Sequence, residues 1–399
     1  MQESTASSFE PNDPATIDDP FPVYKALRDQ DPVHWNPKGF WFISRYEDVL
    51  ACLKDARFSN QPAPFALVHA RNRSKFVAAD VANNLIAFKD APDHTELRAW
   101  LARNFVRRTQ NQQDRFAALA AASCKTLSLG GNVDLVSEFA IPFSSRAICA
   151  VLGFPEADAP RVAEWSNDFF RLFHAIPDGD EFHRLNDSLR AFRQHVLDLM
   201  ALRRAAPIED LISDLVSKMD GSVSDHEVAD NVMLLAADGI GNVQSGLTNC
   251  LSILLQQDRL PEPLFGSTKD VSKLVDECLR LESPGQYQGR ITKESVQIRG
   301  KTIRARSIVL LGLASANRDE AVFENADAFR PLDTRPQHLA FGAGSHMCLG
   351  NAMVRTEIVH ALRALFAEDA PRLVAQPHRH WLARPGHRWL EKLDVEVLA

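Results

Sequence analysis

One cysteine stands in a glycine-rich stretch that leads directly into a strongly helical run, and this placement constrains the chain more than any other feature. Residues 341–350 read Phe-Gly-Ala-Gly-Ser-His-Met-Cys-Leu-Gly. Glycine lets the backbone lie close against a large flat group, and a helix that begins at Cys348 would direct unpaired N–H groups and a positive dipole end at the sulfur. Both effects favour a thiolate. An open thiolate suits the axial position of a haem iron, where electron release from sulfur promotes O–O cleavage.

Two other roles compete for Cys348. A buried cysteine is most often a small hydrophobic residue. Zinc binding is less suitable, because only His346 is close enough in sequence to assist and a tetrahedral site needs four ligands. The other residues of the ten-residue stretch therefore provide the evidence that distinguishes these roles.

The string matches the pattern Phe-x-x-Gly-x-His-x-Cys-x-Gly at every fixed position, and it closely resembles the haem-binding loop of the cytochrome P450 family. The resemblance extends over Pro22 to Val397. It implies a mainly α fold with a small β portion, in which haem b lies between a long distal helix and the proximal helix after the cysteine loop. It also assigns the iron ligand to Cys348 and further cofactor contacts to Phe341, Gly344, His346 and Gly350.

Length, charge and cysteine usage limit the other possibilities. We expect residues 1–21 to form a flexible segment and residues 22–399 to form a single catalytic domain, because no linker or repeat interrupts this chain of 399 residues. A net charge of -7 argues against a nucleic-acid binder. Six cysteines without paired spacing predict reduced thiols in a cytoplasmic protein. Residues 1–20 lack the features of a signal peptide, and the apolar run near 308–316 is too short to span a membrane.

The periodicity of apolar residues predicts mostly helix with a few strands. Residues 33–35 and 40–44 flank a turn and predict a hairpin. Apolar residues at helical spacing predict helices around 49–53, 97–105 and 192–200. A second group of strands is expected over 296–298 and 303–311.

Glu277 and Arg280 lie three apart on one face of a predicted helix. Such pairs usually stabilise a helix by only about 0.2–0.5 kcal/mol at the surface. The resemblance implies a different role, because the pair precedes Cys348 by a separation close to that in the family, where it is buried and holds the segment before the haem loop. Arg330 and Arg335 are both candidates for the arginine that completes this network.

Four basic residues at positions that match the family are expected to hold the haem propionates, which need charge-assisted donors. Alone, each would be an ordinary surface charge. Together with the cysteine they form a ring of cations around one dianionic macrocycle: His94, Arg98, Arg290 and His346.

Residues 234–243 match the long helix that crosses the distal haem face in the family, but the usual acid–threonine pair is missing. The register places Gly241 at the acid position and Asn242 at the alcohol position. Gly239 and Gly241 are expected to leave a groove in the helix. We hypothesise that Asp238, four residues before Asn242, replaces the acid while Asn242 orients the oxygen ligand. Alternatively, Asp238 only caps disturbed backbone, and protons come from substrate or ordered water.

Apolar residues in segments that line the family's substrate cavity predict a large, mainly hydrophobic substrate with a few polar contacts. The polar candidates are Gln286, Gln288 and His387. The predicted apolar lining comprises Phe65, Ile86, Phe170, Leu235, Tyr287 and Leu390.

The resemblance implies a monooxygenase that inserts oxygen from O2 into a C–H bond of a terpenoid- or polyketide-type molecule in secondary metabolism. A ferredoxin-type donor with its reductase would supply electrons at a basic face formed by Arg103, Arg107, Arg108 and Arg355. One alternative is a peroxide-using, coupling, desaturating or ring-modifying haem enzyme. The second is a haem-binding sensor or carrier without catalysis.

Overall fold

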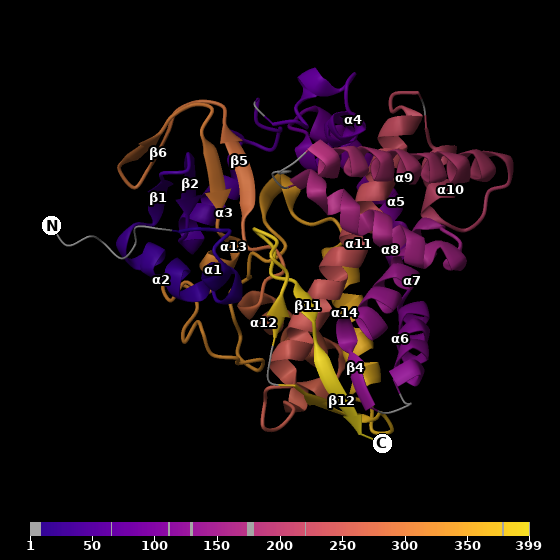
Figure 1. Ribbon diagram of the computed structural model, residues 1–399. Helices are drawn as coiled ribbons and strands as arrows, with labels where there is room; N and C mark the ends of the chain where they lie inside the picture. The colour runs from indigo at the N-terminus through magenta and orange to yellow at the C-terminus, as the bar shows by residue number, and fades with distance from the viewer. Residues whose placement is uncertain are drawn as a thin grey trace.

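The computed structural model describes residues 9–64, 66–110, 112–127, 131–173, 179–219, 221–376 and 379–398. Most of these residues are helical, and the strands gather in small sheets (Figure 1). The mainly α fold with a small β portion is therefore confirmed. The helices are α1 (Pro14–Asp18), α2 (Phe21–Gln30), α3 (Tyr46–Lys54), α4 (Val77–Asn84), α5 (Asp93–Thr109), α6 (Gln113–Leu127), α7 (Ile141–Leu152), α8 (Ala159–Phe169), α9 (Gly179–Ala205), α10 (Leu211–Ser217), α11 (Asp225–Leu254), α12 (Thr268–Leu281), α13 (Leu313–Ala316) and α14 (Asn351–Leu365).

Helix α11 runs through the centre of the helical part, with α8 and α9 beside it (Figure 1). It begins where the Ser224 side chain accepts a hydrogen bond from the backbone N–H of Glu227, which satisfies one of the free donors of the first turn. Most of its side chains are buried, because α7, α8, α9, α12 and α14 pack around it. The central helix is thus fixed along nearly its whole length.

The strands lie mainly on the other side of the molecule from α9 and α10 (Figure 1). Five of the described strands form one sheet in the order β1-β2-β8-β5-β3, with β2 and β8 parallel and the other pairs antiparallel. Small sheets pair β12 with both β4 and β9, β6 with β7, and β10 with β11. The strands are β1 (Val33–Asn36), β2 (Phe40–Ile43), β3 (Phe58–Ser59), β4 (Gly131–Asp134), β5 (Gln288–Thr292), β6 (Val296–Ile298), β7 (Lys301–Ile303), β8 (Ile308–Leu311), β9 (Arg372–Ala375), β10 (His380–Trp381), β11 (Leu390–Lys392) and β12 (Asp394–Leu398).

The predicted elements are present with two differences. The hairpin is confirmed as β1 and β2, and the helices expected around 49–53, 97–105 and 192–200 are α3, α5 and part of α9. The strand expected over 303–311 is interrupted, because β7 ends at Ile303 and β8 begins at Ile308. Arg306, between them, has a φ of 64°, a turn conformation that cannot continue a strand.

The second difference is a buried residue near the N-terminal end. Within the expected flexible segment of residues 1–21, Phe9 is packed on the β region. Phe9 is 1% exposed, and its ring centroid lies 4.4 Å from that of Phe42 and 6.4 Å from that of Tyr287. Burial of an aromatic ring removes a large apolar area from water. Phe9 therefore gives this segment a contact that the sequence did not predict, and the flexibility of the segment stays a prediction.

Candidate active site

One cavity of about 1110 Å³ brings together residues that are far apart in the sequence. Its walls come from α5, α11, β5 and the loop before α14. The predicted site residues that line it are Cys348, His94, Arg98, Arg290, His346, Phe341, Gly350, Asp238, Gly239, Asn242, Ile86, Phe170, Leu235 and Tyr287.

Backbone hydrogen bonds hold the cysteine loop. The N–H of Cys348 donates to Phe341 O at 2.8 Å, and that of Met347 donates to Gly344 O at 3.2 Å. Helix α14 begins at Asn351, three residues later than the expected start at Cys348. Burial raises the pKa of the Cys348 thiol to about 11, although the N–H of Gly350, Arg98 and Arg355 act in the opposite direction. The helix end alone therefore does not favour a thiolate, and a bound metal ion would lower the pKa of this thiol.

Gly344 has a packing role beside the predicted contact with haem. It is not among the residues that line the cavity, its φ is 73°, and a Cβ at this position would lie 2.6 Å from the carbonyl oxygen of Leu53 in α3. Glycine is therefore required for close contact between two backbone segments. The cofactor contact at Gly344 stays a prediction.

Two histidines stack on one wall of the cavity. The His94 and His346 ring centroids lie 3.8 Å apart. Burial, together with the neighbouring basic groups, lowers the pKa of His346 to about 3, and burial followed by Arg98 lowers the pKa of His94. His94 Nε2 is buried and has no partner among the described residues. The stacked rings thus leave one buried ring nitrogen without a hydrogen-bond partner in the described part of the chain.

Two arginines complete the basic wall. Arg98 Nη2 donates to Met347 O at 2.6 Å, and Arg290 Nη2 donates to Gln288 Oε1 at 3.0 Å. Across the described ranges, neither guanidinium forms an ion pair with a carboxylate, and burial lowers the pKa of Arg98 and lowers that of Arg290 to about 10. Buried cations without anions are costly. A thiol donor and unpaired basic groups around one cavity fit a metal-bearing macrocycle with two carboxylates.

The Glu277–Arg280 pair is buried, as expected from the family resemblance. Arg280 Nε donates to Glu277 Oε2 at 2.8 Å and Nη2 donates to Oε1 at 2.9 Å. Arg335 completes the network, with Nε 3.3 Å from Glu277 Oε2. Arg330 contributes its backbone N–H to Glu277, while its side chain pairs with Asp333. The network fixes residues 326–335 to α12 ahead of the cysteine loop.

Asp238 and Asn242 face the cavity together. Asn242 Nδ2 donates to Asp238 Oδ1 at 3.2 Å. The Asp238 side chain is exposed where it lines the cavity, yet the carboxyl lies deep within the protein, and this burial raises its pKa to about 7. No basic side chain of the described residues forms an ion pair with it. This arrangement holds a proton near neutral pH inside the protein.

The two glycines of α11 do not leave the predicted groove. A Cβ on Gly239 would lie 2.6 Å from Ile148, and one on Gly241 would lie 2.6 Å from both Phe170 and Trp389. Gly241 does not line the cavity. These side chains fill the space beside the helix. Phe170 and Trp389 also occupy the position of the Cβ atom that an acidic residue at position 241 would have.

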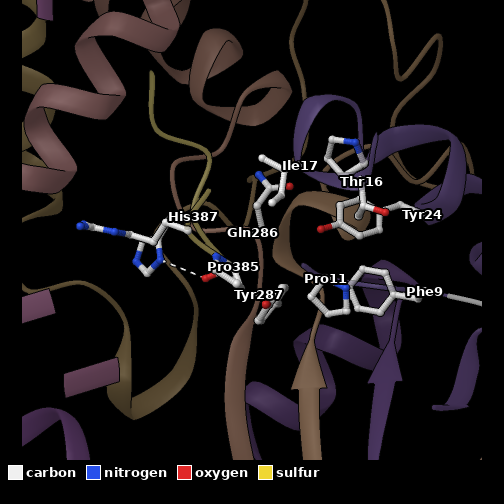
Figure 2. A pocket seen from close by; sticks show the side chains of 12 residues that line it. Phe9, Pro11, Thr16, Ile17, Tyr24, Gln286, Tyr287, Pro385 and His387 are labelled. Carbon is white, nitrogen blue, oxygen red and sulfur yellow. Dashed lines mark hydrogen bonds between the residues drawn. The ribbon is translucent and has the colours of Figure 1, made fainter. Parts of the chain in front are cut away.

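The apolar lining is only partly as predicted. Leu390 is not among the residues that line the cavity, because its side chain is 0% exposed and belongs to a core cluster that includes residues of α11 and α14. Phe65 lies outside the described residues. Of the polar candidates, Gln288 and His387 line the cavity. Gln286 instead lines a small neighbouring pocket with Ile17 and Tyr24, and its Oε1 has no partner in the described chain (Figure 2).

Helical spacing could have revealed two cavity residues that the sequence analysis missed. Asn231 and Leu234 line the cavity with Asp238 and Asn242. They precede Asp238 by seven and four residues, so they lie on the same helix face. The lining residues Pro11 and Asn12 had no comparable signal, because their position depends on how residues 9–20 pack.

The expected basic docking face is largely neutralised. Arg107 and Arg108 both pair with Asp214 at 2.5 Å. Arg355 pairs with Asp276 at 2.6 Å. Arg103 is exposed on α5. A strongly positive patch at this place is therefore not supported.

None of the helices formed by the described residues is long and apolar enough to cross a membrane. The described residues also contain no group of three or more His, Cys, Asp or Glu side chains that could hold a metal ion.

Comparisons with known proteins agree on one family. Residues 271–368 match the family model described as Cytochrome P450. The chain is 31% identical to the biotin biosynthesis cytochrome P450 of Bacillus subtilis, over 99% of both chains, and 32% identical to the mycinamicin IV hydroxylase/epoxidase of Micromonospora griseorubida, over 82% of this chain and 81% of that one. The crystal structure of P450BioI in complex with an acyl carrier protein carrying hexadec-9Z-enoic acid matches with a TM-score of 0.88 at 28% identity, covering 96% of this chain and 100% of that chain.

Proposed function

The chain belongs to the cytochrome P450 family of haem-thiolate enzymes, and we propose that its residues 22–399 form one monooxygenase domain that inserts oxygen from O2 into a C–H bond of a hydrophobic small molecule. The observation that carries this proposal is a single cavity lined by Cys348, four basic side chains and the Asp238–Asn242 pair. Relatives named as hydroxylases and as polyketide enzymes support a role in secondary metabolism.

The residues of the cavity suit haem. Cys348 would ligate iron, and His94, Arg98, Arg290 and His346 would hold the two propionates. When bound, haem supplies the activation of O2. The chain itself contributes the basic wall, an apolar chamber that keeps water from the reacting atoms, and a donor that can release a proton.

Asp238 is the proposed proton donor. Its pKa near 7 lets the carboxyl both hold and release a proton at neutral pH. The Asn242 amide donates to Oδ1 and orients the carboxyl, so the proton is held at one of the two oxygens. Asn242 does not titrate, so Asp238 is the group on this helix face that changes charge.

The family uses redox partners and hydrophobic substrates, and we propose a ferredoxin-type donor with its reductase in the cytoplasm. P450BioI is solved with an acyl carrier protein that carries a fatty acid. A substrate delivered on a carrier protein is therefore one form of the hydrophobic molecule proposed here. The mainly apolar walls of the cavity suit the chemistry of an acyl chain.

A second candidate activity uses peroxide in place of O2 and electrons. The observation that favours it is the absence of the acid–alcohol pair, since Gly241 and Asn242 occupy those positions. A haem-binding sensor or carrier is the remaining alternative.

Two measurements test the proposal. Haem-loaded protein, reduced and exposed to carbon monoxide, is expected to show the red-shifted absorption of a thiolate ligand, and its absence would contradict the proposal. Product formation is then compared with a ferredoxin and reductase or with hydrogen peroxide. Turnover with peroxide alone would favour the second candidate, and no product under either condition with a panel of hydrophobic substrates would favour a sensor.

A further inference from the structure

A buried ion pair joins α11 to α9 beside the cavity. Asp230 on α11 is 0% exposed, and Arg193 on α9 is also buried. Arg193 donates through Nε to Asp230 Oδ1 and through Nη2 to Oδ2, both at 2.7 Å. Two parallel hydrogen bonds fix the relative orientation of both groups. The pair therefore holds the carboxylate in one place.

The same carboxylate fixes a segment of the cavity wall. Asn84 Nδ2, at the end of α4, donates to Asp230 Oδ2 at 2.7 Å. The adjacent Asn231 accepts from the N–H of Ile86 at 2.9 Å and donates to Asn84 O at 3.0 Å. Lys89 pairs with Glu227 at 3.0 Å. Residues 84–89 are thus attached to the first turns of α11 at three places.

The opposite side of this segment faces the substrate chamber. Ile86, Ala87 and Phe88 line the cavity. The ring centroids of Phe88 and Phe173 lie 5.1 Å apart, so the wall also contacts the segment that follows α8. Any displacement of residues 84–89 changes the shape of the chamber directly.

A buried ion pair carries a desolvation penalty, and well-packed apolar side chains in its place are often at least as stabilising. Its advantage is a defined geometry. We propose that Asp230 is a positioning residue that sets which molecules the cavity accepts, by holding residues 84–89 through Arg193 and Asn84. This inference rests on the proposed function, because it concerns the substrate cavity of that enzyme.

The test uses haem-loaded protein and two azole probes, imidazole and 4-phenylimidazole, with dissociation constants measured from the Soret shift. Asn84→Ala removes the side-chain hydrogen bonds with Asp230 and Arg73 and leaves the ion pair intact, so it is expected to fold. Asp230→Asn removes the charge. In both variants 4-phenylimidazole is expected to bind about tenfold more weakly, because a misplaced wall loses contact with the phenyl ring. Imidazole, which is too small to reach the wall, is expected to change less than about twofold.

Asp210→Asn is the matched control. Asp210 is 2% exposed and pairs with Arg203 Nε at 2.5 Å, but it does not line the cavity. It should lower the thermal midpoint and leave the ratio of the two affinities unchanged. Hydrogen exchange at the Ile86 amide is expected to accelerate in Asn84→Ala and not in the control.

The positioning role of Asp230 and the proposed function would be contradicted by different results. An unchanged affinity ratio in Asn84→Ala and Asp230→Asn, or an equal change in Asp210→Asn, would overturn the positioning role alone. No Soret shift with either azole in the wild type would overturn the proposed function, and this inference with it.

Discussion

The cysteine loop and the facing part of α11 border the same cavity but are built in different ways. Backbone hydrogen bonds define the loop, and the buried Glu277–Arg280–Arg335 network fixes the segment ahead of it. On α11 the proposed proton donor is a single carboxyl, Asp238, which lines the cavity and accepts a side-chain hydrogen bond from Asn242. The loop is therefore held by backbone contacts and a buried network, whereas the position of Asp238 depends on few side-chain contacts. A single substitution is expected to disturb the proposed proton delivery more easily than the shape of the loop.

The largest effect is expected at the loop. Cys348→Ser removes the sulfur ligand, so the red-shifted absorption of the reduced carbon monoxide complex should disappear completely and turnover with it. Cys278→Ser, at a buried cysteine on α12, is the control and should keep the absorption. An unchanged spectrum in Cys348→Ser would refute the assignment of the ligand.

The next largest effect is expected in the Glu277 network, which holds the segment ahead of the cysteine loop. Glu277→Gln leaves the buried Arg280 and Arg335 without their carboxylate, and breaking such a pair costs about 3–5 kcal/mol. Denaturant unfolding measures the loss. Asp333→Asn, which removes a half-exposed partner of Arg330, should cost less than about 1 kcal/mol. Equal losses in both variants would show that the network does not hold the loop.

On the α11 side, Asp238→Asn should reduce product formation by about 100-fold and raise the electrons consumed per product. The wild-type rate should fall as pH rises above about 7, because the raised pKa leaves Asp238 protonated below that value and ionised above it. The variant should lack this fall. Asn242→Ala keeps the carboxyl and should keep the pH dependence. Undiminished product with unchanged coupling in Asp238→Asn would remove the proton-donor role.

The smallest effect is expected at Gly241 and tests whether crowding explains the absence of the family's acid from α11. Gly241→Ala places a Cβ against Phe170 and Trp389 and should lower the free energy of unfolding by about 1–3 kcal/mol. Gly285→Ala has no atom within 4 Å of its new Cβ and should be nearly neutral. If Gly241→Ala is also neutral, crowding at this position does not explain the absent acid.

These contrasts explain what the sequence could predict. The cysteine loop, the Glu277–Arg280 pair and the basic wall were found because their spacing is local or matches the family motif. Asp238 and Asn242 share one face because residues four apart must do so on a helix. Three features depended on tertiary contacts instead: Gly344 meets Leu53, Phe170 and Trp389 fill the space at Gly241, and Leu390 packs into the core. No pattern along the chain reports which distant side chain occupies a given space.

The burial of Phe9 has a practical consequence for work with this enzyme. Its ring lies against Tyr287, which borders the chamber, and the nearby Pro11 and Asn12 border the chamber themselves. Deleting the chain up to and including Phe9 would therefore remove a ring that supports the surroundings of bound ligands. Ligand affinities of a chain that begins at residue 10 are expected to differ from those of the full chain.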